Sequence, residues 1–353
     1  MAFTTIAKPS DHFDCPKWDG SDSTTTITGM GFKPDALWIR RYDGSGHPVL
    51  NNSSEGTGQN WLPSGNNANN TTVHVASYTS DGFTLTGNIN DTNDASQKYF
   101  ASCWKINGGT ESTNTSGSIS AEVQVNQTAG ISICRYTGTG ANGTIGHGLG
   151  AIPKLIIGKS TTVADKGDVF NGGTTLYTDT ETDLIQFAGN GQFQDDTGGW
   201  NDTKPTDTVW SIGNKTHHNT SSSPSIAYCF TEIKGFSKFG FYEASGQSQN
   251  APKIYCGFKP KWIMIKRWDA AENWFVKSTV IDFGQLPNDG TMKRTVKFDD
   301  NTSNTNCTVN VDSSGFRPKT TDGKANAENG KYIYMAFAEM PMVGTNGTIA
   351  LAI

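Results

Sequence analysis

Charged residues and good helix formers are scarce in this sequence. Of the 353 residues, 17% are charged, 34% are hydrophobic and only 10 are Leu. Because helices are built mainly from Ala, Leu, Glu, Lys and Arg, this scarcity argues against a helical bundle and against a doubly wound α/β fold. No stretch approaches the length of an apolar membrane span. The start of the chain has no basic region followed by an apolar one, so we expect synthesis without a signal peptide and no membrane insertion.

The motifs of common enzyme and metal sites are also missing. The six cysteines are scattered without a CxxC pair, so a zinc site is not expected and the thiols are predicted to be reduced, small apolar residues. The sequence has no GxSxG elbow and no HExxH motif. His217 and His218 are adjacent, and in an extended chain they would point to opposite faces and could not chelate one ion. We therefore predict no enzyme activity, no cofactor, and no catalytic, cofactor-binding or metal-ligating residue.

Positive charge is not concentrated anywhere in the chain. The net charge is -5, the isoelectric point is about 5.7, and the charges are dispersed. A nucleic-acid groove needs concentrated positive charge, so nucleic acid is not an expected partner. What is abundant is Thr with 44 residues, Gly with 40 and Asn with 29, beside nine Trp. Because so much aromatic area is not left in water, we expect a folded, all-β protein with many turns.

A threefold internal repeat is the strongest signal in the sequence. A pattern of Gly, an apolar residue, Pro and a β-rich run that ends in basic residues occurs in residues 31–41, 150–159 and 257–267. An aromatic residue near a turn precedes each proline, and a strongly apolar run closes each repeat, in residues 99–104, 226–230 and 332–337. Landmarks that recur in one order at a long period indicate tandem structural units.

Each repeat is predicted to be a jelly-roll-like β-sandwich unit of about 100 residues. Its closing strand is apolar on nearly every residue and is expected to be central and covered on both faces. In unit two we read Gly158 as standing where the other units have a basic residue, so we expect its β-run to end earlier. The predicted organisation is an N-terminal arm (1–12), unit one (13–108), a solvated linker (109–120), unit two (121–235), unit three (236–342) and a C-terminal tail (343–353). The apolar end of that tail predicts either an added strand or a subunit contact.

The nine tryptophans include the candidates for a sugar-binding surface. Four lie in apolar β-runs and are predicted to be core residues, namely Trp38, Trp104, Trp210 and Trp262. Three lie in polar surroundings rich in Gly and Asn, namely Trp61, Trp200 and Trp274. These three are the candidates for an exposed aromatic platform, although burial under a loop is the alternative that the sequence favours for each.

The repeats resemble a known family. Residues 136–150 with Pro153 look like the opening of a repeat domain in tail-fibre-like virion proteins of marine tailed phages, and residues 227–240 look like its closing strand and the junction to the next copy. Residues 257–267 match the following copy, and residues 3–6 are similar to the start of the leading unit. The resemblance implies a virion structural role and a homotrimer, and it carries no catalytic residues to transfer.

These observations lead us to expect a bacteriophage virion protein, a tail fibre or tail-associated appendage that takes part in host adsorption and receptor binding. Its partners would be other virion proteins, through the N-terminal arm or the C-terminal tail, and a host-surface polysaccharide. It would be made in the host cytoplasm and would end in the virion. A capsid decoration or head appendage protein is the main alternative, and a polysaccharide depolymerase is a third.

Overall fold

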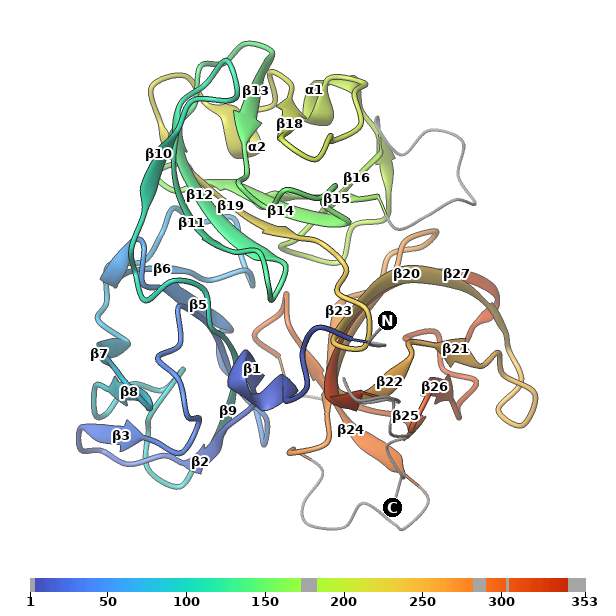
Figure 1. The fold of residues 1–353 in the computed structure, drawn as a ribbon. Coiled ribbons are helices and arrows are strands. Elements are labelled where there is room, and N and C mark those ends of the chain that lie inside the picture. Colours follow the sequence, from blue (N-terminus) through green and yellow to red (C-terminus); the bar gives the residue numbers. More distant parts are fainter. Residues whose placement is uncertain (1–3, 173–182, 282–289, 303–304, 342–353) are drawn as a thin grey trace.

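The structure, a computed structural model, describes residues 4–172, 183–281, 290–302 and 305–341. The fold is all-β, with 47% strand and 3% helix, as the composition predicts. Figure 1 shows three units that follow one another along the chain and lie around a common centre. Within the described ranges, no helix is long and apolar enough to cross a membrane.

The elements of the three units have the following bounds. The first unit contains η1 (Pro9–Asp11), β1 (Phe13–Asp14), β2 (Lys17–Asp19), β3 (Thr25–Ile27), β4 (Ala36–Arg41), β5 (Val49–Asn52), β6 (Gly56–Trp61), β7 (Val75–Thr79), β8 (Gly82–Leu85) and β9 (Lys98–Trp104). The second contains β10 (Ser112–Asn114), β11 (Ala121–Asn126), β12 (Ile131–Thr137), β13 (Gly143–Gly146), β14 (Leu155–Ser160), β15 (Asp168–Asn171), β16 (Asp183–Gln186), β17 (Gln194–Asp195), α1 (Thr197–Trp200), β18 (Val209–Ile212), α2 (Thr216–Asn219) and β19 (Pro224–Phe230). The third contains β20 (Ser237–Ser245), β21 (Ile254–Tyr255), β22 (Phe258–Arg267), β23 (Trp274–Ser278), β24 (Thr291–Lys297), β25 (Thr305–Asp312), β26 (Gly315–Pro318) and β27 (Glu328–Pro341).

The three units share one strand order, which confirms the internal repeat. In the larger sheet of each unit, the closing strand lies between an early strand of the unit (β1, β12 or β20) and the strand that follows the proline, and it is antiparallel to both. The orders are β1-β9-β4-β5-β6, β12-β19-β14-β15-β16 and β20-β27-β22-β23-β24. The smaller sheet of each unit is also equivalent, with orders β3-β8-β7, β13-β18 and β21-β26-β25. In unit three, β24 pairs with β25, so the two sheets join into a near-closed, barrel-like sheet of eight strands.

The expectation that the β-run of unit two ends early is wrong. Counted from the proline, Gly158 corresponds to Ile39 and Ile265, and the basic residue follows it as Lys159. Strand pairing gives the same register, because Gly158 lies opposite Ala227 of the closing strand and Ile39 lies opposite its own closing strand. The strand β14 therefore runs to Ser160 and is as long as β4. Glycine fits there because the Cβ atom of His218 covers the position, at 3.3 Å from where a side chain would begin.

Every unit has its own apolar core between its two sheets. The core of unit one contains Trp18, Phe83 and Tyr99, and that of unit two contains Tyr136 and Trp210. The core of unit three includes Tyr242, which stacks on Tyr332 with ring centroids 4.9 Å apart. All six cysteines are free and buried, and each belongs to one of the apolar clusters, as small apolar residues would. The sandwich interiors therefore account for one face of each large sheet.

A fourth core lies where the three units meet and covers the other face of each large sheet. Trp104 of the first unit lies 6.1 Å from Phe230 of the second and 5.8 Å from Trp262 of the third, measured between ring centroids. Trp38 packs 4.7 Å from Trp104, and Phe337 lies 5.5 Å from it. The closing strands β9, β19 and β27 are thus buried from both sides, as their sequences predict. The four tryptophans expected in the core are all buried there or inside a unit.

The contacts between units repeat in a ring. Trp61 at the end of β6 in unit one packs 5.0 Å from Phe187, which follows β16 in unit two. Phe187 in turn packs 5.6 Å from Trp274 of unit three. Phe298, which follows β24 of unit three, packs 5.5 Å from Trp38 of unit one. Each unit therefore presents the end of an equivalent strand to the next unit, and this head-to-tail contact closes after three copies, as cyclic symmetry requires.

A buried asparagine holds the same junction in each unit, namely Asn93, Asn219 and Asn326. Its side-chain oxygen accepts the backbone N–H of a residue at or just after the end of β2, β12 or β20, which is Ser21 (2.9 Å), Thr139 (2.8 Å) or Ser245 (3.2 Å). Its side-chain nitrogen donates to two backbone carbonyls, which belong to Ser23 and Thr86, to Ala141 and Gly213, or to Gln247 and Thr320. Since buried backbone groups need partners, this residue type is required at the end of β2, β12 and β20.

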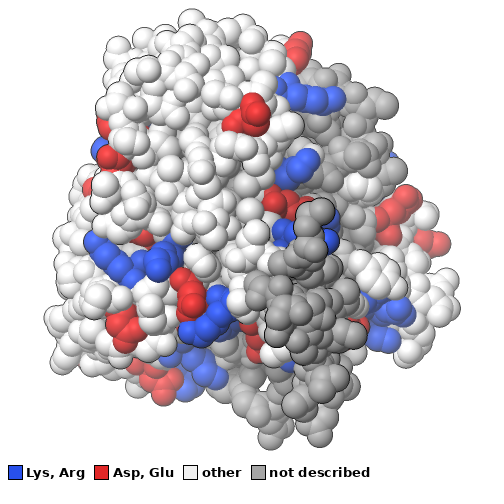
Figure 2. Space-filling view, in the orientation of Figure 1, with Lys and Arg blue, Asp and Glu red and all other residues white. Residues whose placement is uncertain are grey.

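The segments outside the repeats differ in their placement. In the arm, Ile6 is buried in the core between the units. The predicted linker contributes β10 to the edge of unit two, where Thr113 pairs with Glu122. The tail (343–353) lies outside the described residues. In the view of Figure 2, charges of both signs are interspersed and uncharged residues form most of the surface of the upper unit, unit two.

Candidate functional site

The three tryptophans proposed as an exposed platform do not form one. Trp61, Trp200 and Trp274 are each at most 3% exposed. Trp61 lies at the contact between units one and two, and Trp200 stacks on His218 at 4.8 Å. Trp274 donates its ring N–H to the carbonyl of Gln186 in the neighbouring unit. Burial, the alternative that the sequence favours, is therefore the outcome for all three.

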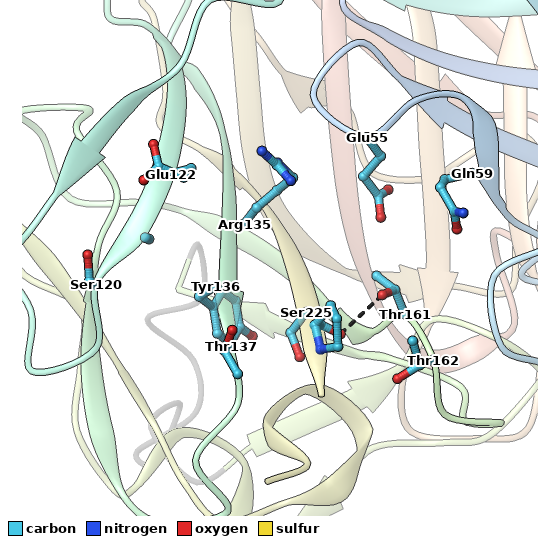
Figure 3. A pocket seen from close by; sticks show the side chains of 12 residues that line it. Glu55, Gln59, Ser120, Glu122, Arg135, Tyr136, Thr137, Thr161, Thr162 and Ser225 are labelled. Atoms are coloured by element: carbon cyan, nitrogen blue, oxygen red, sulfur yellow. Dashed lines mark hydrogen bonds between the residues drawn. The ribbon is translucent and has the colours of Figure 1, made fainter. Parts of the chain in front are cut away.

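A polar hollow of about 460 Å³ lies instead between units one and two (Figure 3). It is lined by Glu55, Gln59, Ser120, Ala121, Glu122, Arg135, Tyr136, Thr137, Thr161, Thr162, Pro224 and Ser225. Glu55 and Gln59 come from unit one, and the other residues come from unit two. Figure 3 shows Glu55 and Gln59 facing Thr161 and Thr162 across the open space, with Arg135 on a neighbouring wall.

The hollow occurs where unit two departs from the other two repeats. Tyr42, Thr161 and Trp268 stand eight residues after the proline of their repeats. Their backbone N–H groups donate to equivalent carbonyls, those of Lys98 (2.9 Å), Pro224 (2.8 Å) and Lys331 (3.0 Å). The three positions are therefore structurally equivalent, and only the one in unit two has a small, hydroxylated side chain.

In the other two contacts between units, a side chain of the neighbouring unit covers this aromatic residue. Unit three covers Tyr42 of unit one, and unit two covers Trp268 of unit three. The guanidinium of Arg294 lies 5.4 Å from the ring of Tyr42 and donates to its carbonyl. Phe193 packs 5.2 Å from Trp268 and donates its backbone N–H to the carbonyl of Trp268 at 2.9 Å. At Thr161 the backbone contact remains, from the N–H of Asn69 at 2.7 Å, but the aromatic ring is missing. Thr161 is one of the residues that line the hollow.

Glu55 forms the wall that unit one contributes. Its carboxylate accepts from the side-chain amides of Asn52 (2.8 Å) and Asn69 (3.2 Å), which fix its orientation. Burial raises the pKa of Glu55 to about 7, although the hydrogen bond from Asn52 acts in the opposite direction. A carboxyl group with this pKa is partly protonated near neutral pH and can then donate as well as accept a hydrogen bond.

The cations near the hollow are already paired. Arg135 donates from Nε to Glu111 at 2.8 Å, and its Nη2 atom binds the other oxygen of the same carboxylate. Burial tends to raise the pKa of Glu111, but the hydrogen bonds from Arg135 and Ser54 lower it below its usual value. Lys159 lies fully buried behind Glu55, where its Nζ donates to the carbonyls of Asp165 (2.7 Å) and Val163 (3.3 Å). Burial lowers the pKa of Lys159 to about 8.

The remaining lining consists mostly of hydroxyl groups. Thr162 shares a hydrogen bond of 2.7 Å with Ser223, and Thr161 donates to the carbonyl of Pro224 at 3.1 Å. The one aromatic residue of the lining, Tyr136, is buried and donates its hydroxyl to the carbonyl of His218. Hydroxyl, amide and carboxylate groups without an open aromatic face suit the edges of a hydroxylated ligand such as a saccharide.

His217 and His218 have a different arrangement from the one expected. They lie in the short helix α2 and not in an extended chain, and both Nδ1 atoms bind the carboxylate of Asp168, at 2.8 and 2.9 Å. His217 also reaches Asp165 at 3.3 Å. Burial tends to raise the pKa of Asp168, but the two histidines lower it to about 2. No group of three or more ligands able to hold a metal ion was found among the described residues.

A departure from the repeat pattern marks the position of the hollow in the sequence. Aligned on their prolines, two repeats carry an aromatic residue at the eighth position and the other carries Thr161. Glu55 carries no such signal, because it becomes part of the site only through the contact between units.

Comparison with known proteins identifies one family. The family model described as "Domain of unknown function (DUF7483)" matches residues 8–341. No curated protein and no solved structure matches the chain.

Proposed function

We propose, for this chain, which belongs to the DUF7483 family, the role of a bacteriophage virion protein whose hollow between units one and two binds a glycan of the host surface. The observation that carries the binding proposal is the replacement of an interface aromatic by Thr161, which opens a polar site in one of three equivalent places. The virion role rests on the resemblance of the repeats to tail-fibre-like proteins. A tail fibre or tail-associated appendage is the form that we favour.

A variant that restores the missing aromatic tests the binding site. Thr161→Tyr places at this position the residue that unit one has at Tyr42, so the fold has a precedent for it. We expect it to fill part of the hollow and to weaken binding of purified host-surface polysaccharide at least tenfold. Thr26→Tyr makes the same chemical change at an exposed strand position of unit one and should leave binding unchanged. Unaltered binding by Thr161→Tyr would overturn the proposal for this site.

The location in the virion needs a separate test. Antibody labelling of purified virions, viewed by negative-stain electron microscopy, should place the protein on the tail. Label confined to the capsid shell, with tens to hundreds of copies, would support the capsid decoration or head appendage protein instead.

The raised pKa of Glu55 keeps a depolymerase as a second candidate, since a carboxyl group that is protonated near neutral pH can act as a general acid. Incubation with host capsule or lipopolysaccharide followed by a reducing-end assay tests this. Reproducible sugar release that Glu55→Gln abolishes would establish an enzyme in place of a binding protein.

The homotrimer that the resemblance implies would use surfaces other than the contacts between units. Those contacts are already formed three times within one chain, through Trp61, Phe187 and Phe298, and the ring is closed. Sedimentation equilibrium of the full-length protein measures the assembly directly.

A further inference from the structure

We infer that the hollow between units one and two selects neutral or amino saccharides and discriminates against saccharides that carry carboxylate, sulfate or phosphate groups. This inference rests on the proposed function, and it adds the chemical class of the ligand.

The charges around the hollow favour such ligands. Three carboxylates, Glu55, Glu111 and Glu122, come from the two units that form it, with Glu55 and Glu122 in its lining. The Arg135 guanidinium binds both oxygens of Glu111. An anionic group of a ligand would therefore compete with a bidentate ion pair for its only cationic partner in the lining.

The second cation, Lys159, is not accessible for direct contact with a ligand. Lys159 is fully buried behind Glu55, and its ammonium donates to two backbone carbonyls of its own loop. Its position over the ring of Trp61, at 5.7 Å, holds it further within the contact between units. A ligand in the hollow would reach the lysine only by breaking these contacts, so the charge that the ligand meets directly is that of the carboxylates.

The carboxylates have acceptor capacity for a ligand. Each oxygen of Glu55 accepts one hydrogen bond from an asparagine amide, and a carboxylate oxygen can accept two. Glu122 accepts one hydrogen bond from Thr113 through Oε1, at 2.8 Å. A sugar hydroxyl or an ammonium group can donate to the remaining positions, whereas an ionised acid has no proton to donate and is repelled by the charge of Glu122 and by that of Glu55 where Glu55 is ionised.

The test compares three probes of similar length with isothermal titration calorimetry of the full chain. They are a dextran oligosaccharide (neutral), a chitosan oligosaccharide (amino) and an alginate oligosaccharide (acidic). We expect the neutral or the amino probe to bind and the acidic probe to bind at least tenfold more weakly. Glu122→Gln should reduce the ratio of amino to acidic affinity severalfold, whereas Glu243→Gln, at an exposed position of β20, should not change it.

The outcomes separate this inference from the proposed function. Suppose that the acidic probe binds the wild-type protein as tightly as the others do and that Thr161→Tyr weakens this binding. This result overturns the charge selectivity but leaves a glycan site in place. A preference that Glu122→Gln does not alter overturns the role of these carboxylates. If the wild-type protein binds none of the probes and none of the host polysaccharide, the proposed function fails as well.

Discussion

Removal of the buried asparagine should destabilise each unit at the end of β2, β12 or β20, where this side chain binds the backbone. In Asn219→Ala, the backbone N–H of Thr139 and the carbonyl of Gly213 lose the side chain that they bind, whereas the carbonyl of Ala141 keeps its hydrogen bond from the Thr139 hydroxyl. The side chain is fully buried, so water cannot replace it without a rearrangement of the junction. Asn93→Ala and Asn326→Ala likewise remove the partner of one backbone N–H and of at least one carbonyl, so the three variants repeat one experiment within a single protein.

The magnitude follows from the number of groups left without partners. Each donor or acceptor left unsatisfied inside the protein costs about 1–3 kcal/mol, so the N–H and the one carbonyl that have no other partner predict a loss of at least ~2 kcal/mol per variant. Urea denaturation followed by tryptophan fluorescence measures the free energy of unfolding, and the nine tryptophans report on all three units. We expect similar losses from the three variants, because the partners have the same geometry in each unit.

The matched control is Asn66→Ala, which changes the same residue type at an exposed loop position. It should alter the free energy of unfolding by no more than about 0.5 kcal/mol. The reasoning would be refuted if all three buried variants stayed within about 1 kcal/mol of the wild type, since unsatisfied buried groups should cost more than this.

Three further predictions concern the shared core, the histidine pair and the thiols. Trp38→Ala should cost about 3–5 kcal/mol in thermal or urea unfolding, because it empties a fully buried site where rings from all three units meet. Burial tends to lower the pKa of His217, but its hydrogen bond to Asp168 and the nearby negative charges raise the pKa above its usual value. The contribution of His217 to the stability of the folded protein is therefore complete below about pH 6.5 and is lost as the pH rises through the pKa of the folded state. The free energy of unfolding of the wild type should therefore fall as the pH rises above about 6.5, and the fall should be smaller in His217→Gln. A thiol-reactive aromatic disulfide should label no cysteine of the native protein and all six in urea, because all six are buried.

The fold within each unit could be predicted because its landmarks belong to neighbouring strands. Trp18, Tyr136 and Tyr242 lie on β2, β12 and β20, and each pairs with a residue of the closing strand of its unit. The strand after the proline pairs with the other edge of that closing strand. An apolar closing strand requires packing on both faces, so its sequence predicts a central position in the sheet. The sequence does not show that the second face packs against the other two units.

The contacts between units could not be predicted, because local composition describes neighbours in sequence and not in space. Trp61 and Trp274 have polar neighbours along the chain, yet both are buried where the end of one unit meets the next. His217 and His218 were interpreted as extended, whereas the buried carboxylate of Asp168 binds both in a single helical turn. In each case the partner is far away in the sequence, so no residue spacing reveals it.

Internal symmetry offers a way to find a candidate site, because it allows equivalent positions within one chain to be compared. Three copies in one ring face the same structural demand, so a position that serves only the contact between units should keep its residue type. Tyr42 and Trp268 meet that demand with an aromatic ring that the neighbouring unit covers, whereas Thr161 does not. A stabilising contact has therefore been replaced at one of three equivalent places, and the space left there is lined by carboxylate, guanidinium and hydroxyl groups. The absence of this packing at one copy alone supports the proposal of a ligand site there, because a position that served only stability would favour the aromatic ring in all three.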